Sequence, residues 1–192
     1  MLRELAGAAG PGAGGGRVKL PPEQPSSALH ALVGRFLDER YSMALATEGP
    51  DGPWVASVYF AGGLDALYFL SSLASRHGTN LRRSPRIAAA INEDEHNWRA
   101  IRGVQLEGTC QLGDSPGVWL RGWRAYLAKF PVARDLFRGG AGGGVARKVR
   151  GVRLYVVRPR RVYYLDNRLG FAERHEVLDI VVPVGCGSAS AT

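Results

Sequence analysis

The sequence predicts a mainly β domain with peripheral helices, in which antiparallel strands close into a barrel. Short apolar segments of β type recur along the chain, and turn sequences such as GPDGP at 49–53 and AGGLD at 61–65 separate them. Short turns join neighbouring strands in antiparallel pairs, and closing the sheet into a barrel removes its exposed edges. Stretches of helical period before and between the strands place helices at the periphery.

The first helix is expected from Ser26 or Ser27 to about Arg40, because either serine is a good N-cap and an apolar stripe follows. That stripe consists of Leu29, Leu32, Val33, Phe36 and Leu37. A short basic helix lies between the third and fourth strands and ends at Ser84, because the residue before a proline resists helix. The expected strands are 42–47, 54–60, 66–71, 86–92, 100–112, 152–157 and 161–165, the last two joined at Pro159.

The strand over 100–112 is expected to have one buried and one wet face, because apolar and polar residues alternate along it. Gly108 within it predicts a bulge or the close approach of another backbone segment. A helix then runs from about Ser115, and a second short one starts at Pro131, which suits a first helical position. Aromatic residues at helical spacing predict a core-facing stripe on the first of these helices: Trp119, Trp123, Tyr126 and Phe130.

Length and composition indicate one cytoplasmic domain over 26–182 in a chain of 192 residues. The Gly- and Pro-rich segment 1–25 is expected to be disordered, and 183–192 to form a flexible tail. The sequence shows neither a secretory signal nor an apolar run long enough to cross a membrane. Two cysteines, Cys110 and Cys186, argue against a disulfide framework and predict reduced thiols.

The net charge of +8 favours phosphate-bearing partners. The chain has neither a GxxxxGK[ST] sequence nor a GxGxxG after a strand, which excludes the P-loop and Rossmann ways of binding nucleotides. The segment 147–161 holds seven basic residues in fifteen, with tyrosines among or just beyond them, and single-stranded nucleic acid is one partner for such a surface. Its alternation favours the other interpretation, an ordinary strand with an exposed arginine face.

The stretch LYFLSSLASRHGTNLRRSPRIAAAIN at 67–92 concentrates four arginines and one histidine between two strands, without an acid. Ser71 and Ser72 end a strand, where their hydroxyls can bond a polar edge of a ligand. The helix that follows begins with unpaired N–H groups and a partial positive charge, which attract an anion. The residues that suit one phosphate monoester there are Arg76, His77, Thr79 and Asn80. Arg82, Arg83 and Arg86 are expected to be exposed to solvent.

The strands WVASVYF at 54–60, LYFLSS at 67–72 and IRGVQLEGTCQL at 101–112, with the basic stretch between them, resemble the pyridoxamine 5′-phosphate oxidase-like FMN-binding split barrels. The phrases KFPVAR at 129–134 and DNRLGF at 166–171 extend the similarity to a poorly characterised bacterial branch of that superfamily. The resemblance covers about residues 28–175. It implies a six-stranded antiparallel split β-barrel of the FMN-binding type that forms a homodimer, with FMN at the subunit interface.

The resemblance also implies which residues contact the cofactor. Ser57, Val58 and Tyr59 of the second strand, and Leu70, Ser71 and Ser72 of the third, would line the flavin ring. Arg76, His77, Thr79 and Asn80 would hold its phosphate. Gln105, on the wet face of the long strand, would reach the ligand across the dimer.

These expectations describe an FMN-dependent oxidoreductase that passes hydride or electrons to an unknown small molecule, with a nicotinamide nucleotide as candidate donor. The C-terminal sequence HEVLDIVVPVGCGSASAT lacks the Trp-, Gln- and Arg-rich segment that builds the substrate site of a true pyridoxamine phosphate oxidase. The vitamin reaction is therefore not expected. The alternative is a haem- or deazaflavin-binding carrier, with His77, His96 and His175 as candidate haem ligands.

No catalytic side chain and no metal site are assigned from the sequence. Glu93, Asp94 and Glu95 stand in a row and are expected to form a solvated acidic bend. Trp98, just after them, either closes over the flavin or packs in the core or the interface.

Overall fold

The computed structural model describes residues 25–134 and 151–179. Of the segment 1–25 that was expected to be disordered, residues 1–24 lie outside this range, whereas Pro25 is the first residue of a helix. The tail 183–192 and most of the helix expected from Pro131 also lie outside the described residues. The described elements are α1 (Pro25–Glu39), β1 (Ser42–Gly49), β2 (Gly52–Gly62), β3 (Leu67–Ser72), α2 (Arg76–Arg83), β4 (Arg86–Asn92), β5 (Arg102–Leu112), α3 (Pro116–Lys129), β6 (Val152–Asp166) and β7 (Arg174–Asp179).

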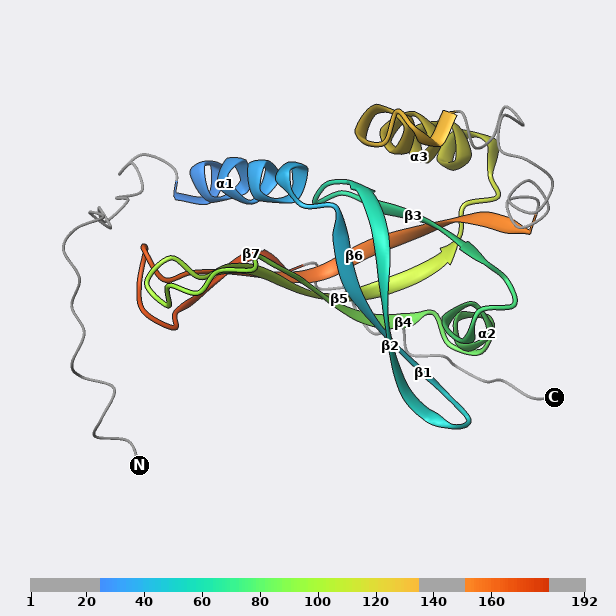
Figure 1. Cartoon of the computed structure of the whole chain (residues 1–192), viewed down its shortest axis with the longest axis horizontal. Coiled ribbons are helices and arrows are strands. Elements are labelled where there is room, and N and C mark those ends of the chain that lie inside the picture. Colours follow the sequence, from blue (N-terminus) through green and yellow to red (C-terminus); the bar gives the residue numbers. More distant parts are fainter. Residues whose placement is uncertain (1–24, 135–150, 180–192) are drawn as a thin grey trace, which may run out of the picture.

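The strands form one antiparallel sheet in the order β3-β2-β1-β4-β5-β6-β7, and β3 also pairs with β6 (Figure 1). That extra pairing closes the first six strands into a barrel, which confirms the predicted fold class. β7 is a further strand on the free edge of the C-terminal half of β6. Among the described residues, no helix combines the length and the apolarity that a membrane crossing requires.

β6 corrects the prediction of two strands joined at Pro159, because the chain runs as one strand from Val152 to Asp166. The pairing with β5 shifts register between Glu107 and Gly108, and Pro159 faces Gly108 at that point. A bulge tolerates a proline that cannot donate to the ladder. A side chain at Gly108 would overlap the Arg158 carbonyl, so the bulge and the close approach predicted at this glycine are both confirmed.

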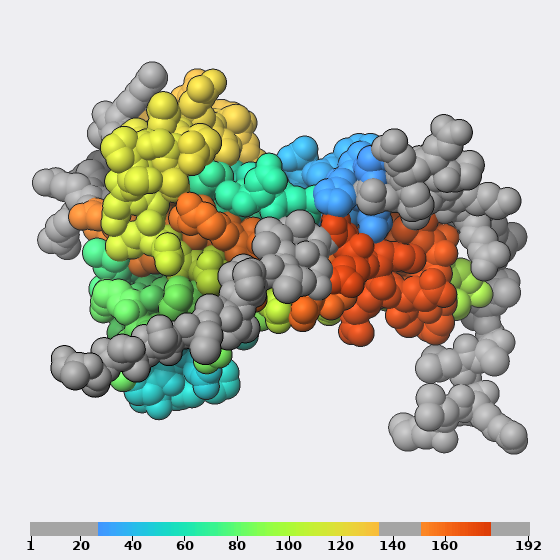
Figure 2. All heavy atoms as spheres, turned by 180° about the vertical axis from the view of Figure 1, so that it is seen from behind, coloured from blue at the N-terminus to red at the C-terminus, as the bar shows by residue number. Residues whose placement is uncertain are grey.

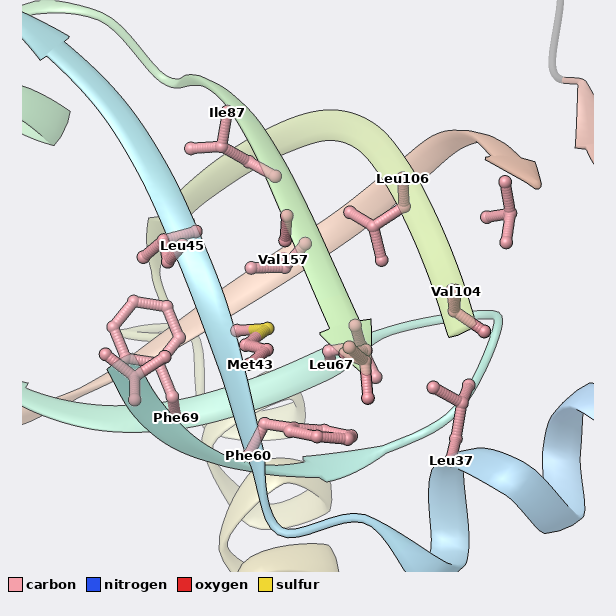
Figure 3. Packing of buried hydrophobic residues seen from close by; sticks show 14 of the residues in the cluster. Leu37, Met43, Leu45, Phe60, Leu67, Phe69, Ile87, Val104, Leu106 and Val157 are labelled. Atoms are coloured by element: carbon pink, nitrogen blue, oxygen red, sulfur yellow. The ribbon is translucent and has the colours of Figure 1, made fainter. Parts of the chain in front are cut away.

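The barrel interior holds the main hydrophobic core (Figure 3). It is filled by the inward-facing residues, which alternate with outward-facing ones along the strands. Leu45, Phe60 and Phe69 are buried there, in contact with residues from the other strands. The apolar stripe of α1 joins this core through residues such as Phe36. The Phe36 and Tyr164 rings are arranged edge to face, with 5.8 Å between their centroids. Burying each such side chain contributes about 1.5–3 kcal/mol.

The aromatic stripe on α3 packs only in part. Tyr126 is buried in a small cluster beside β2, as predicted, but Trp119 is 48% exposed and stacks on Trp123 with 5.8 Å between ring centroids. The prediction of a continuous core-facing stripe was therefore wrong at the N-terminal end of the helix. Figure 2 shows the yellow atoms of α3 at one end of the molecule, next to the orange atoms of β6.

Candidate functional site

The start of α2 is fixed by Ser75, which sequence reasoning did not single out. Its Oγ accepts from the Gly78 N–H at 3.0 Å and donates to the Ser72 carbonyl at 2.8 Å. Ser75 is therefore the N-cap, and it ties the helix to the end of β3. The cap leaves Arg76 as the first residue of the helix, beside N–H groups that have no partner within the helix.

Arg76 is exposed, and its guanidinium faces the β1–β2 hairpin. Its Nη2 donates to the Asp51 carbonyl at 3.1 Å, and its Cζ lies 4.6 Å from the centre of the Trp54 ring. A guanidinium has five N–H donors, and the described residues offer this one no carboxylate. Arg76 is thus a cation held in place by the hairpin, with donors left over for an anion. The hairpin projects from the barrel on the side of α2 (Figure 1).

His77, unlike Arg76, points into the protein. It is 8% exposed, its Nε2 lies 2.6 Å from the Ser71 Oγ, and its ring meets the edge of Phe69 at 6.2 Å. Burial lowers the pKa of His77 below its ordinary value, so the ring is neutral at pH 7. A neutral imidazole that bonds Ser71 is suited to fixing the direction of the serine hydroxyl.

Thr79 and Asn80 also divide between the two sides of the helix. Thr79 is exposed, and its hydroxyl accepts from the Arg82 guanidinium at 3.3 Å. Asn80 is 3% exposed, and its Nδ2 donates to the Thr47 Oγ1 at 3.1 Å. The structure therefore places Arg76 and Thr79 toward solvent, and uses the polar atoms of His77 and Asn80 inside the protein.

The candidates on β2 and β3 lie where these two strands part. Their pairing covers only Phe60–Gly62 with Leu67–Phe69, after which β2 stays with β1 and β3 pairs with β6. Ser57 and Tyr59 point outward from β2, Tyr59 with 63% of its surface exposed, while Val58 points into the core. On β3, three half-buried residues face β6: Leu70, Ser71 and Ser72.

The outer face of β1, β4 and β5 carries a shallow apolar depression of about 400 Å³, which sequence reasoning missed. Small side chains form its floor, and Val55, which is 60% exposed, stands at its side. The signal was present in SMALAT and RIAAAIN, where alanine occupies the outward positions Ala44, Ala46, Ala88 and Ala90. Gln105 borders the depression and accepts from the Arg174 Nε at 3.0 Å.

The acidic bend is solvated only in part: Asp94 is exposed, as expected, but Glu93 is paired with two arginines. Glu93 accepts two bonds from the Arg102 guanidinium, at 2.7 and 2.9 Å, and pairs with Arg40 at 3.0 Å. The Arg102 hydrogen bonds hold the pKa of Glu93 below its ordinary value. Trp98 is half-exposed and meets the edge of Phe171 at 5.0 Å between ring centroids.

The turn after β6 is built on Asp166, which is fully buried. Its carboxylate accepts from the Arg168 Nε at 2.8 Å and Nη2 at 2.6 Å, and from the Tyr164 hydroxyl at 3.1 Å. Burial alone would raise the pKa of Asp166, but the bonds from Arg168 outweigh it and hold that pKa below its ordinary value. In the same turn, Asn167 donates to the Trp98 carbonyl, so the DNRLGF phrase anchors the loop that carries Trp98.

A closed six-stranded antiparallel barrel with a capped basic helix after its third strand defines a split-barrel protein of the flavin-binding type of fold. The family model described as pyridoxamine 5′-phosphate oxidase matches residues 29–166, and the chain belongs to this family. Curated relatives include a UPF0306 protein of Cronobacter sakazakii, 26% identical over 145 residues, which are 74% of this chain and 90% of the relative. The UPF0306 protein YhbP of Escherichia coli O157:H7 is 23% identical over 144 residues, 74% of this chain and 88% of its own.

Solved structures share the fold at low sequence identity. A conserved hypothetical protein from Mycobacterium tuberculosis superposes with a TM-score of 0.57 at 22% identity, over 72% of this chain and 85% of the other. A heme binding protein from Mycobacterium smegmatis gives a TM-score of 0.57 at 21% identity, over 77% of this chain and 57% of the other. At these identities the likeness extends to the fold alone.

Proposed function

We propose that two copies of this chain bind FMN between them and that the protein is an FMN-dependent oxidoreductase. One observation carries the proposal: Arg76 stands exposed at a capped helix start after β3, with unused donors, and lies against the β1–β2 hairpin. A helix start with an adjacent arginine suits one phosphate group. The outward side chains of β2 and the serines at the end of β3 suit the polar edge of a planar ring.

The residues present fit FMN, but fewer of them would contact it directly than the sequence predicted. Arg76 and Thr79 would contact the phosphate directly. His77 would act through Ser71, and Asn80 would support the helix from Thr47, because their polar atoms are already bonded inside the protein. Ser57, Tyr59, Ser71 and Ser72 would line the ring with their side chains, while Leu70 and the inward-facing Val58 would contribute mainly backbone.

FMN, when bound, would supply the hydride and electron transfer. The residues of this chain would hold and orient it: Arg76 would neutralise phosphate charge, and the neutral His77 would hold the Ser71 side chain in place beside the ligand. The second copy would cover the open side of the ring and bring its Gln105 to it. As donor we propose a reduced nicotinamide nucleotide, for which anaerobic bleaching of the flavin absorption by NADH or NADPH is the direct assay.

The homodimer is supported by the outer face of small residues around Ala44 and Ala88. An exposed apolar sheet face lined with alanines lets a second sheet approach closely. Val55→Lys places a charge there and is expected to shift the light-scattering mass to that of a monomer and to release the flavin. Val132→Lys, at a 68% exposed valine that does not line this depression, is the matched control. A variant at Val55 that stays dimeric contradicts the assigned interface.

The experiment that tests the cofactor is the visible spectrum of the purified protein, followed by identification of the released chromophore. FMN absorption is expected, and Arg76→Ala should raise the FMN dissociation constant about 10- to 150-fold, the loss of one charge-assisted hydrogen bond. Arg83→Ala, at an exposed arginine on the same helix, is the control. Equal dissociation constants for the two variants would remove Arg76 from the phosphate site, and a protein that ignores added FMN would end the proposal.

The second candidate is a haem-binding protein, and His175 is the observation that favours it. The Nε2 of this histidine is buried without a hydrogen-bond partner in the described part of the chain. His77 is bonded to Ser71, and the side chain of His96 is almost fully exposed beside Glu95. A Soret band that His175→Ala abolishes would establish this function in place of the flavin. A deazaflavin would be recognised by the mass of the released chromophore.

A further inference from the structure

Tyr155 on β6 has a buried hydroxyl without a partner. The residue is 2% exposed, and its phenol oxygen makes no hydrogen bond within the described residues. Its ring is stacked on Phe69 with 4.9 Å between centroids and 5° between planes, so it cannot turn aside to find an acceptor. Buried polar groups in native proteins nearly always have a partner, in the protein, in water or in a ligand.

Tyr155 borders a pocket of about 220 Å³ between α2, the end of β5 and β6. The pocket is far larger than the ~30 Å³ that one water molecule occupies. Leucines form its apolar walls, and three polar side chains reach it. Its lining is Leu73, Gly78, Leu81, Arg82, Gln111, Leu112 and Tyr155.

Gly78 lets α2 pack closely against the end of β3 and against the tyrosine hydroxyl. A Cβ at this position would lie 3.0 Å from the Tyr155 oxygen and 2.6 Å from the Ser72 carbonyl. A side chain here would clash with these oxygens, so the phenol can approach α2 only because position 78 is glycine. Gly78 is on the side of α2 that faces away from Arg76, and the pocket adjoins the proposed phosphate site only through the 3.3 Å bond from Arg82 to Thr79.

The polar groups of the pocket favour an acceptor with negative charge. Burial raises the pKa of Tyr155, so its hydroxyl stays a neutral donor at physiological pH. Arg82 donates to the Leu73 carbonyl at 2.7 Å and to Thr79 at 3.3 Å, and has no carboxylate partner among the described residues. One O–H donor and one cation, with leucines beyond them, match a single carboxylate on a short apolar chain.

We propose that this pocket binds a small monocarboxylate, whose carboxylate accepts from Tyr155 and faces Arg82 while its chain packs on Leu73, Leu81 and Leu112. One cation and a small volume suit a carboxylate better than a phosphate ester, which carries more charge. The proposal is independent of which cofactor the protein binds.

The test is calorimetric titration of the full-length protein with acetate, butyrate, hexanoate and benzoate, and with hexanamide as the uncharged match of hexanoate. We expect saturable binding that strengthens from acetate to the longer chains, and at least tenfold weaker binding of hexanamide. Tyr155→Phe keeps the stacked ring and should weaken hexanoate binding at least tenfold. Tyr163→Phe, on the same strand and outside the pocket, should leave it unchanged.

Arg82→Gln separates the two recognition elements. This variant should abolish the preference for hexanoate over hexanamide, with circular dichroism showing that the fold is kept. The proposal is overturned if none of the carboxylates binds the wild-type protein, or if Tyr155→Phe and Tyr163→Phe bind hexanoate equally. Binding at the flavin site would show instead as displacement of FMN, which Arg76→Ala would affect and Tyr155→Phe would not.

Discussion

Asp166→Asn tests whether the buried carboxylate after β6 stabilises the fold. Asp166 accepts bonds from the Arg168 Nε, Nη2 and backbone N–H, and from the Tyr164 hydroxyl. Asparagine keeps one acceptor oxygen, turns an NH₂ group toward the donors and removes the charge. The exchange therefore loses at least one of the two bonds from the guanidinium.

The size of the effect follows from these bonds. Losing one hydrogen bond to a charged group costs about 1.5–3 kcal/mol, and breaking a fully buried pair costs about 3–5 kcal/mol. The side chain of Arg168 is 30% exposed, so water recovers part of the loss. We expect the free energy of unfolding to fall by about 2–3 kcal/mol, which in a chain of this size lowers Tm by about 4–12 °C.

Measuring the stability at low pH is the decisive part of the assay. The folded-state pKa of Asp166 is lowered, so its contribution is present above the unfolded-state value near ~4 and is lost as the pH falls through the folded-state pKa. Urea unfolding followed by circular dichroism should show a large difference between wild type and Asp166→Asn at pH 7 and a shrinking one below pH ~4. Asp94→Asn, at an exposed carboxylate, is the control. Equal stabilities at pH 7, or a difference that persists in acid, would refute the reasoning.

Two other changes follow from close contacts and burial. Gly108→Ala should lower the free energy of unfolding by more than ~2 kcal/mol, because its methyl group would overlap the Arg158 carbonyl. Gly34→Ala in α1 has open space around it and should raise the free energy of unfolding by about 0.5–1 kcal/mol. Thermal unfolding measures both variants, and equal effects would contradict the close contact at Gly108. Burial lowers the pKa of Lys129 to about 8. In the unfolded chain Lys129 keeps its proton to higher pH than in the folded protein, so raising the pH from 8 to ~10 should stabilise the wild type relative to Lys129→Met. Parallel curves of unfolding free energy against pH for the two proteins would contradict this prediction.

The fold was predictable because its signals are local. The hairpin turns, the alternation of buried and exposed residues in β5 and the bulge at Gly108 can all be read from neighbouring residues. The continuity of β6 was not predictable in this way. A proline normally ends a strand, and Pro159 stays within β6 because the pairing with β5 has a bulge where Pro159 faces Gly108. β7 was missed because its sequence RHEVLD is mostly polar, and pairing with β6 is what orders it.

The candidate site was predictable as a segment, but not residue by residue. The sequence identified the basic stretch, and helical period alone does not say which of its side chains turn inward. That choice depends on distant residues: Phe69 and Ser71 receive His77, and Thr47 receives Asn80. Glu93 shows the same limit, since Arg40 and Arg102 convert an apparently solvated acid into a paired one.

The placement of β6 determines when the chain can finish folding during translation. β6 bonds to β5 along one edge and to β3 and β7 along the other. The end of β3 at Ser72 can pair with Val152 only after the ribosome has synthesised residue 152. Until the ribosome has released that strand, β3 and β5 present open edges that invite pairing with other chains. The nascent chain is therefore most exposed to aggregation before residue 152 is synthesised, and a pause in translation there is expected to prolong that exposure.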